Sequence, residues 1–124
     1  MANGSAPSRF RVTVAAGGHV LRSSSGEKIS IGRDLACSVP VTDPHVSLRH
    51  GEILFTGEGV VYRDLKSRNG SQVRRGSQTI RVDPTTGYQC LLADGDELRI
   101  GNSMDPTVLQ IRLEGPSRMV QDDS

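Results

Sequence analysis

Several features are scarce in this chain of 124 residues, and each scarcity excludes a class of protein. There is no tryptophan and only 3% of the residues are aromatic, so a core must be built from valine, isoleucine and leucine. No stretch approaches the roughly 20 apolar residues of a membrane-spanning helix. Residues 1–10 lack the charged and then apolar pattern of a secretory signal peptide. We therefore expect a cytoplasmic protein with no membrane partner.

An excess of charge of one sign is also missing. The formal net charge is +1, which is too balanced to predict binding to nucleic acid or to an anionic membrane. Thirteen of the fifteen basic residues are nevertheless arginine. Genome composition explains such a bias as well as function does, but planar guanidinium groups suit bidentate recognition of phosphate better than lysine does.

Cysteine is scarce too, and nothing resembles a metal site. Cys37 and Cys90 form no CxxC pair, and the three histidines form no ligand set with them. We expect free thiols in a reducing compartment, and neither a metal ion nor a cofactor.

Glycine and proline, in contrast, are well represented, with fourteen and six residues. Many turns favour many short strands, and polar and apolar residues alternate with period two in most of the segments between turns. Expected strands lie near residues 10–14, 19–23, 28–32, 49–55, 59–63, 71–74, 78–82, 88–92, 97–101 and 107–113. No segment has the apolar stripe of a helix. The pattern predicts an all-β sandwich, and the polar ends, residues 1–8 and 115–124, are expected to be disordered tails.

Three loops carry unusual chemistry, and each alone is a weak signal. Their order and spacing together resemble the signature of forkhead-associated (FHA) domains. The matching residues are Gly32-Arg33, Ser47-x-x-His50 and Asp64-x-x-Ser67-x-Asn69-Gly70, followed by Leu91, Gly95-Asp96 and Ile100-Gly101. The resemblance covers nearly the whole expected domain, residues 9–114.

This resemblance implies a sandwich of about eleven mostly antiparallel strands whose loops at one end bind a phosphothreonine peptide. It implies a partner protein that carries phosphothreonine, or a serine/threonine kinase itself, and no catalytic activity. Threonine is expected over serine because a small pocket in the family accepts the γ-methyl group. A phosphoryl group carries about −1.5 to −2 charges at neutral pH and needs short, charge-assisted donors.

The resemblance also assigns roles to particular residues. Arg33 is expected to donate to the phosphate, Ser47 to give it a hydroxyl hydrogen bond, and Asn69 to hold the backbone of the peptide. Five motif residues are expected to shape or brace the loops without touching phosphate: Gly32, His50, Asp64, Ser67 and Gly70.

Two positions depart from the family pattern, and a third is expected to select the sequence of the bound peptide. Leu48 stands where the family often has a polar or basic residue, and it cannot bind phosphate. Arg68 replaces a small or hydroxylated residue, and we hypothesise that its guanidinium compensates for Leu48; a solvated turn arginine is the alternative. His45 stands where the family often reads the third residue after the phosphothreonine. The turn after Arg74 has an extra residue and is expected at the rim of the site.

Alternatives remain open at this level. Asp43, His45 and Ser47 contain the side chains of a hydrolytic triad, but they lie on one loop without an oxyanion hole or a glycine-flanked nucleophile. A scaffold or self-association domain that needs no phosphate is a second possibility, which Leu48 supports. The chain is also compatible with the regulatory end of a larger transcription or secretion protein. Direct binding of nucleic acid through the arginines is the weakest alternative.

Overall fold

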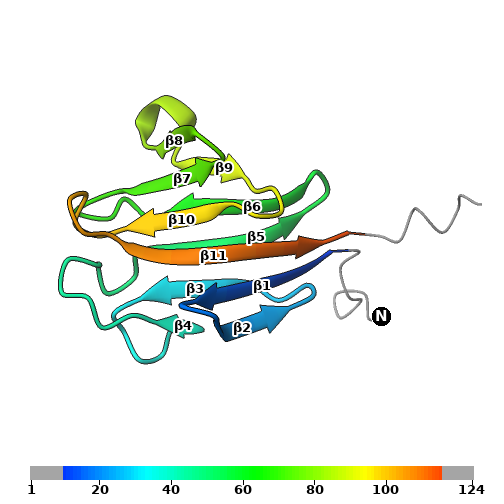
Figure 1. Cartoon of the computed structure of the whole chain (residues 1–124), viewed down its shortest axis with the longest axis horizontal. Coiled ribbons are helices and arrows are strands. Elements are labelled where there is room, and N and C mark those ends of the chain that lie inside the picture. Colours follow the sequence, from blue (N-terminus) through cyan, green and yellow to red (C-terminus); the bar gives the residue numbers. More distant parts are fainter. Residues whose placement is uncertain (1–9, 116–124) are drawn as a thin grey trace, which may run out of the picture.

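Two β-sheets packed face to face make up residues 10–115, the part of the chain that the computed structural model describes (Figure 1). The first sheet has six strands, in the order β2 (His19–Ser24), β1 (Arg11–Ala16), β11 (Thr107–Glu114), β10 (Glu97–Ile100), β7 (Ser71–Arg75) and β8 (Gln78–Val82). The second has five, in the order β4 (Val39–Pro40), β3 (Ile29–Gly32), β5 (Gly51–Thr56), β6 (Gly59–Asp64) and β9 (Gln89–Leu91). Only the short β3–β4 pair among these strands is parallel.

The predicted fold class is confirmed. Each of the ten segments with period-two alternation forms a strand, and the observed ends lie within about two residues of the expected ones. Strand β4 was not predicted, because two residues are too few to show any alternation. The expected tails fall almost entirely outside the described residues.

Aliphatic side chains from both sheets fill the space between them. Val12 and Val14 of β1 are fully buried, as the alternation of that strand predicts, and Ile53 of β5 in the other sheet belongs to the same buried cluster. Tyr62 is the one aromatic residue among the fully buried side chains of residues 10–115. The only helical segment of this region is a 3₁₀ turn, η2 (Pro84–Thr86), so no helix there is long and apolar enough to cross a membrane.

Loops gather at the two ends of the sandwich, and these ends differ. The loops β3–β4, β4–β5, β6–β7 and β10–β11 share one end, at the left of Figure 1. The β7–β8 turn lies at the other end, because β7 runs five residues away from Gly70 before it turns. The expectation that the turn after Arg74 lies at the rim of the site is therefore wrong.

An ion pair stabilises that second end. The Asp96 carboxylate is fully buried, and it accepts two hydrogen bonds from the Arg75 guanidinium, at 2.9 Å from Nε and 2.8 Å from Nη2. It also accepts the backbone N–H of Ala93 at 2.8 Å. The Arg75 Nη2 donates in addition to the Leu91 carbonyl, which fastens β7 to the end of β9.

The Asp96→Ala variant should lose about 3 kcal/mol of unfolding free energy, because it leaves the guanidinium and the Ala93 amide without their acceptor. Urea unfolding measures this loss. The Glu97→Ala variant is the control, since Glu97 forms a half-exposed pair with Arg99 worth at most about 1 kcal/mol. Equal losses in the two variants would contradict the structural role of Asp96.

Candidate functional site

Three loops from different strand pairs are tied together at one end of the sandwich. The Arg33 amide donates to the Ser47 carbonyl at 3.0 Å, which joins the β3–β4 and β4–β5 loops. The Arg68 amide donates to Ser47 Oγ at 3.1 Å, and Asn69 Nδ2 donates to the His45 carbonyl at 2.7 Å, which adds the β6–β7 loop. The structure therefore brings Arg33, Ser47, Arg68 and Asn69 together, although 36 positions separate the first from the last.

Arg33 is exposed but not free to swing. Its Nε donates to the Val46 carbonyl at 2.6 Å, which fixes the plane of the guanidinium. Its two Nη groups make no hydrogen bond or ion pair with any residue between 10 and 115, so they remain available as donors. A guanidinium held by one nitrogen is a pre-organised receptor for an oxyanion.

Gly32 allows the β3 end to lie directly against the β4–β5 loop. A Cβ atom at this position would lie 2.1 Å from the Leu48 carbonyl oxygen, a distance that no side chain tolerates. The close approach places the Arg33 amide within reach of Ser47. The Leu48 carbonyl itself accepts the Asp34 amide at 3.2 Å, while the Leu48 side chain is 54% exposed.

Ser47 is held through its backbone by His50. The Ser47 amide donates to His50 Nδ1 at 3.1 Å, and His50 Nε2 donates to the Gly70 carbonyl at 2.8 Å. These two bonds require a neutral imidazole with its proton on Nε2. The Ser47 hydroxyl accepts from the Arg68 amide, so its own proton is free to be donated outward.

Burial lowers the pKa of His50 below its ordinary value, and the Gly70 carbonyl and the nearby Asp64 carboxylate oppose this shift only in part. The Asp64 Oδ2 atom lies 3.7 Å from His50 Nε2. Because the desolvation of the charged ring dominates, the neutral form that the hydrogen bonds require is also the form that burial favours.

A buried polar chain shapes the β6–β7 loop. Asp64 Oδ1 accepts the Ser67 amide at 2.7 Å, and Oδ2 accepts the hydroxyls of Ser67 and Ser71, both at 2.6 Å. Since the Ser71 proton is used in this way, the hydroxyl of Tyr62 donates to Ser71 Oγ, at 2.7 Å. Desolvation raises the pKa of Tyr62, so the phenol stays protonated. The Gly70 amide closes the turn by donating to Ser67 Oγ at 3.0 Å.

Sequence reasoning missed Tyr62 and Ser71. Both occupy ordinary strand positions, and their polar role depends on burial beside Asp64, which the sequence does not display. A hydroxyl directly after the Asn69-Gly70 turn is the one signal that pointed to Ser71.

The side chains of a hydrolytic triad are present but not arranged as one. His45 Nδ1 lies 3.3 Å from Asp43 Oδ1, whereas Ser47 Oγ contacts the Arg68 amide and not His45. The His45 amide and the Thr107 hydroxyl also bond to the Asp43 carboxylate and lower its pKa. Asp43 thus braces the loop. Within residues 10–115 no group of three His, Cys, Asp or Glu side chains is placed to hold a metal ion.

Comparison with known proteins identifies the family. A family model of the FHA domain matches residues 29–101, which is more than half of the chain. No curated protein sequence matches the chain.

Solved structures agree with this match. The first FHA domain of Rv1747 from Mycobacterium tuberculosis is 26% identical, with a TM-score of 0.65 over 87% of this chain and 98% of its own. A structure described as an analysis of phosphothreonine-dependent FHA domain interactions is 25% identical, with a TM-score of 0.57 over 85% of this chain and 94% of its own. The N-terminal FHA domain of Rad53p from S. cerevisiae, in complex with a phosphothreonine peptide, is 21% identical, with a TM-score of 0.60 over 85% and 93%.

Lowering the pH should weaken the bracing of Ser47. Since the pKa of His50 is lower in the folded than in the unfolded state, the unfolded chain binds a proton first as the pH falls. The unfolding free energy should therefore be highest above about pH 6.5 and fall as the pH drops from there toward the folded-state pKa of His50.

An NMR titration of the His50 imidazole measures this directly. The pKa of His50 should lie below the ordinary value of about 6.5, because burial disfavours the charged ring. A pKa at or above that ordinary value would contradict the neutral bridge.

Proposed function

The chain belongs to the FHA domain family, and we propose that it is a phosphopeptide-binding module that recognises phosphothreonine on a partner protein through Arg33 and Ser47. One observation supports this proposal: Arg33 is bonded through its amide and its Nε to the loop that carries Ser47, while its Nη groups have no partner within residues 10–115 and the Ser47 hydroxyl keeps a proton to donate. Such a pair suits an oxyanion with several acceptor oxygens.

The surroundings favour a dianion over a neutral group. Arg68 is exposed in the β6–β7 loop, and its amide contacts Ser47 Oγ. Lys66, two residues earlier in the same loop, lies over the Tyr88 ring, with its Nζ 5.6 Å from the ring centroid. Asp64, the acid of this loop, is buried, and its carboxylate accepts from hydroxyl and amide donors of the protein itself.

Asn69 supplies the second part of the proposed recognition. Its Nδ2 bonds to the His45 carbonyl, which sets the side chain across the opening between two loops, and its Oδ1 is left to accept an N–H. In this proposal the amide group of Asn69 holds the peptide backbone, and His45, exposed beside it, selects among residues that follow the phosphothreonine. A serine/threonine kinase of the cytoplasm is the proposed source of the phosphate.

Binding without phosphate is the second candidate, and the exposed leucines favour it. Leu48 and Leu35 are 54% and 85% exposed in adjacent loops at the same end of the molecule. An apolar peptide that docks there would bind equally well with and without phosphate.

Removing the Arg33 guanidinium should weaken binding of phosphothreonine peptides by about 2–4 kcal/mol, because charge-assisted hydrogen bonds to a dianion are lost. Isothermal titration of the Arg33→Ala variant with a peptide selected from an oriented phosphothreonine library measures this loss. Arg63→Ala, which removes an exposed arginine from β6, is the matched control and should bind as the wild type does.

The unphosphorylated version of the same peptide completes this test. It should bind neither the wild type nor the Arg33→Ala variant. Equal affinity of the wild type for both peptides would sink the phosphate-dependent function and support the apolar alternative.

Arg68→Ala should weaken the same peptide by about 1 kcal/mol if its side chain adds a second guanidinium to the phosphate contact. The backbone hydrogen bond from Arg68 to Ser47 survives this change, so Ser47 keeps its place. Unchanged affinity would show that Arg68 is a solvated turn residue. Arg68→Lys separates charge from geometry, since lysine keeps the first and loses the second.

A further inference from the structure

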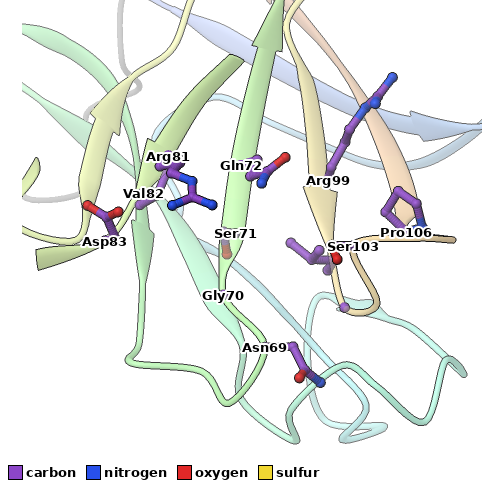
Figure 2. Close-up of a pocket in the computed structure, with 12 residues that line it drawn as sticks. Asn69, Gly70, Ser71, Gln72, Arg81, Val82, Asp83, Arg99, Ser103 and Pro106 are labelled. Carbon is purple, nitrogen blue, oxygen red and sulfur yellow. The ribbon is translucent and has the colours of Figure 1, made fainter.

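Two depressions adjoin the loops of the proposed phosphate site, and their walls differ in chemistry. The first, of about 200 Å³, borders Asn69 and carries polar side chains of the six-stranded sheet, among them Gln72 and Arg81 (Figure 2). The second, of about 180 Å³, lies against β3 and β5 of the other sheet, and residues of the neighbouring loops, including Ala36 and Leu65, complete it. We call this second depression the β3–β5 pocket.

The β3–β5 pocket is continuous with the proposed site along the chain. Asp34, which lines the pocket, directly follows Arg33, and Arg49, which also lines it, comes two residues after Ser47. The Asp34 amide donates to the Leu48 carbonyl at 3.2 Å, so the two loops are joined where the pocket begins. A peptide whose phosphate lies at Arg33 and Ser47 therefore brings its neighbouring residues close to the pocket.

Apolar side chains gather in and beside this pocket. The buried Ile31 and Cys37 belong to its wall, and so does Leu65, whose side chain is 38% exposed. Leu35 stands between two lining residues, and Leu48 carries the carbonyl that joins the loops. Three of the seven large exposed apolar residues within residues 10–115 thus lie in the pocket or in the loops that border it. Such a concentration marks an interaction site, whereas single exposed apolar residues need no explanation.

The charges of the pocket cancel, so it does not select a charged group. Two basic and two acidic residues line it: Lys28, Arg49, Asp34 and Glu52. Glu52 is paired with Lys28 at 3.5 Å, and Asp34 Oδ1 accepts the Ala36 amide at 2.9 Å. The volume is below the roughly 300–1,000 Å³ of small-molecule sites, so the pocket suits one side chain better than a separate ligand.

We propose that the β3–β5 pocket binds a large apolar side chain, such as leucine or methionine, that precedes the phosphothreonine in the bound peptide. This inference rests on the proposed function, because Arg33 and Ser47 place the peptide beside the pocket. His45, the proposed reader of the residues that follow the phosphothreonine, does not line the pocket, which is therefore left to the residues that precede it. Arg49 makes no hydrogen bond or ion pair within residues 10–115, so its guanidinium is available to the carbonyl groups of the peptide.

Isothermal titration with phosphothreonine peptides tests this preference. Each peptide carries leucine at one position before or after the phosphothreonine, and it is compared with the same peptide carrying alanine or glutamate there. At one preceding position, the leucine peptide should bind the wild type about fivefold to thirtyfold more tightly than the alanine peptide, because the leucine side chain leaves water. The glutamate peptide should bind no more tightly than the alanine peptide, since the charges of the pocket cancel.

Leu65→Ser removes apolar wall from the pocket and should abolish the preference for leucine while the affinity for the alanine peptide stays the same. The hydrogen bond from the Leu65 amide to the His50 carbonyl survives this change. Leu91→Ser is the matched control and should keep the full preference, because Leu91 is an exposed leucine of β9 in the same sheet but outside the pocket. In NMR spectra, the Leu65 methyl signals should shift more with the leucine peptide than with the alanine peptide, and those of Leu91 with neither.

The outcomes separate this inference from the function on which it rests. A wild type that binds phosphothreonine peptides without a preference for leucine, prefers leucine only after the phosphothreonine, or prefers glutamate overturns this inference alone. The same follows if Leu91→Ser reduces the preference as much as Leu65→Ser, or if Leu65→Ser weakens the leucine and alanine peptides equally. A wild type that binds no phosphothreonine peptide, or binds the leucine peptide equally well without its phosphate, overturns the proposed function and this assignment with it.

Discussion

The neutral imidazole of His50 is the interaction on which the proposed site depends. It accepts the Ser47 amide with one nitrogen and donates to the Gly70 carbonyl with the other, so it fixes two loops that leave different strands. Its burial keeps the ring out of water and, by lowering its pKa, disfavours the second proton that would break the bridge. Asp64 stabilises the β6–β7 loop in addition, because its carboxylate accepts hydrogen bonds from the hydroxyls of Ser67 and Ser71. Ser47 therefore presents its hydroxyl from a rigid backbone.

The features that stabilise the sandwich lie apart from the proposed site. Its core is aliphatic and continuous, and its second end is fastened by the Arg75–Asp96 ion pair. The end that carries the proposed site instead collects glycine, serine and asparagine, whose backbone and side-chain groups bond across loops. Gly32 is indispensable to that arrangement because any Cβ would collide with the Leu48 carbonyl. The arginines at this end are exposed. The hydrogen bond from Arg33 Nε to the Val46 carbonyl fixes the orientation of the guanidinium and leaves its positive charge without an acidic partner.

Much of this could be predicted from sequence, and the remainder has identifiable causes. Period-two alternation located ten strands because most of them bury one face, and the order of three weak motifs indicated the family. Strand β4 escaped notice because it has two residues. Gly95-Asp96 was recognised only as part of the family motif, since the partner of the buried Asp96 carboxylate, Arg75, lies 21 positions away.

A structure of the domain with a bound phosphothreonine peptide tests the central claim most directly. The account requires phosphate oxygens within about 3.2 Å of both an Arg33 Nη atom and Ser47 Oγ, with the His50 bridge intact. A complex whose phosphate lies elsewhere on the molecule, or projects into solvent while the peptide contacts the exposed leucines, would contradict it.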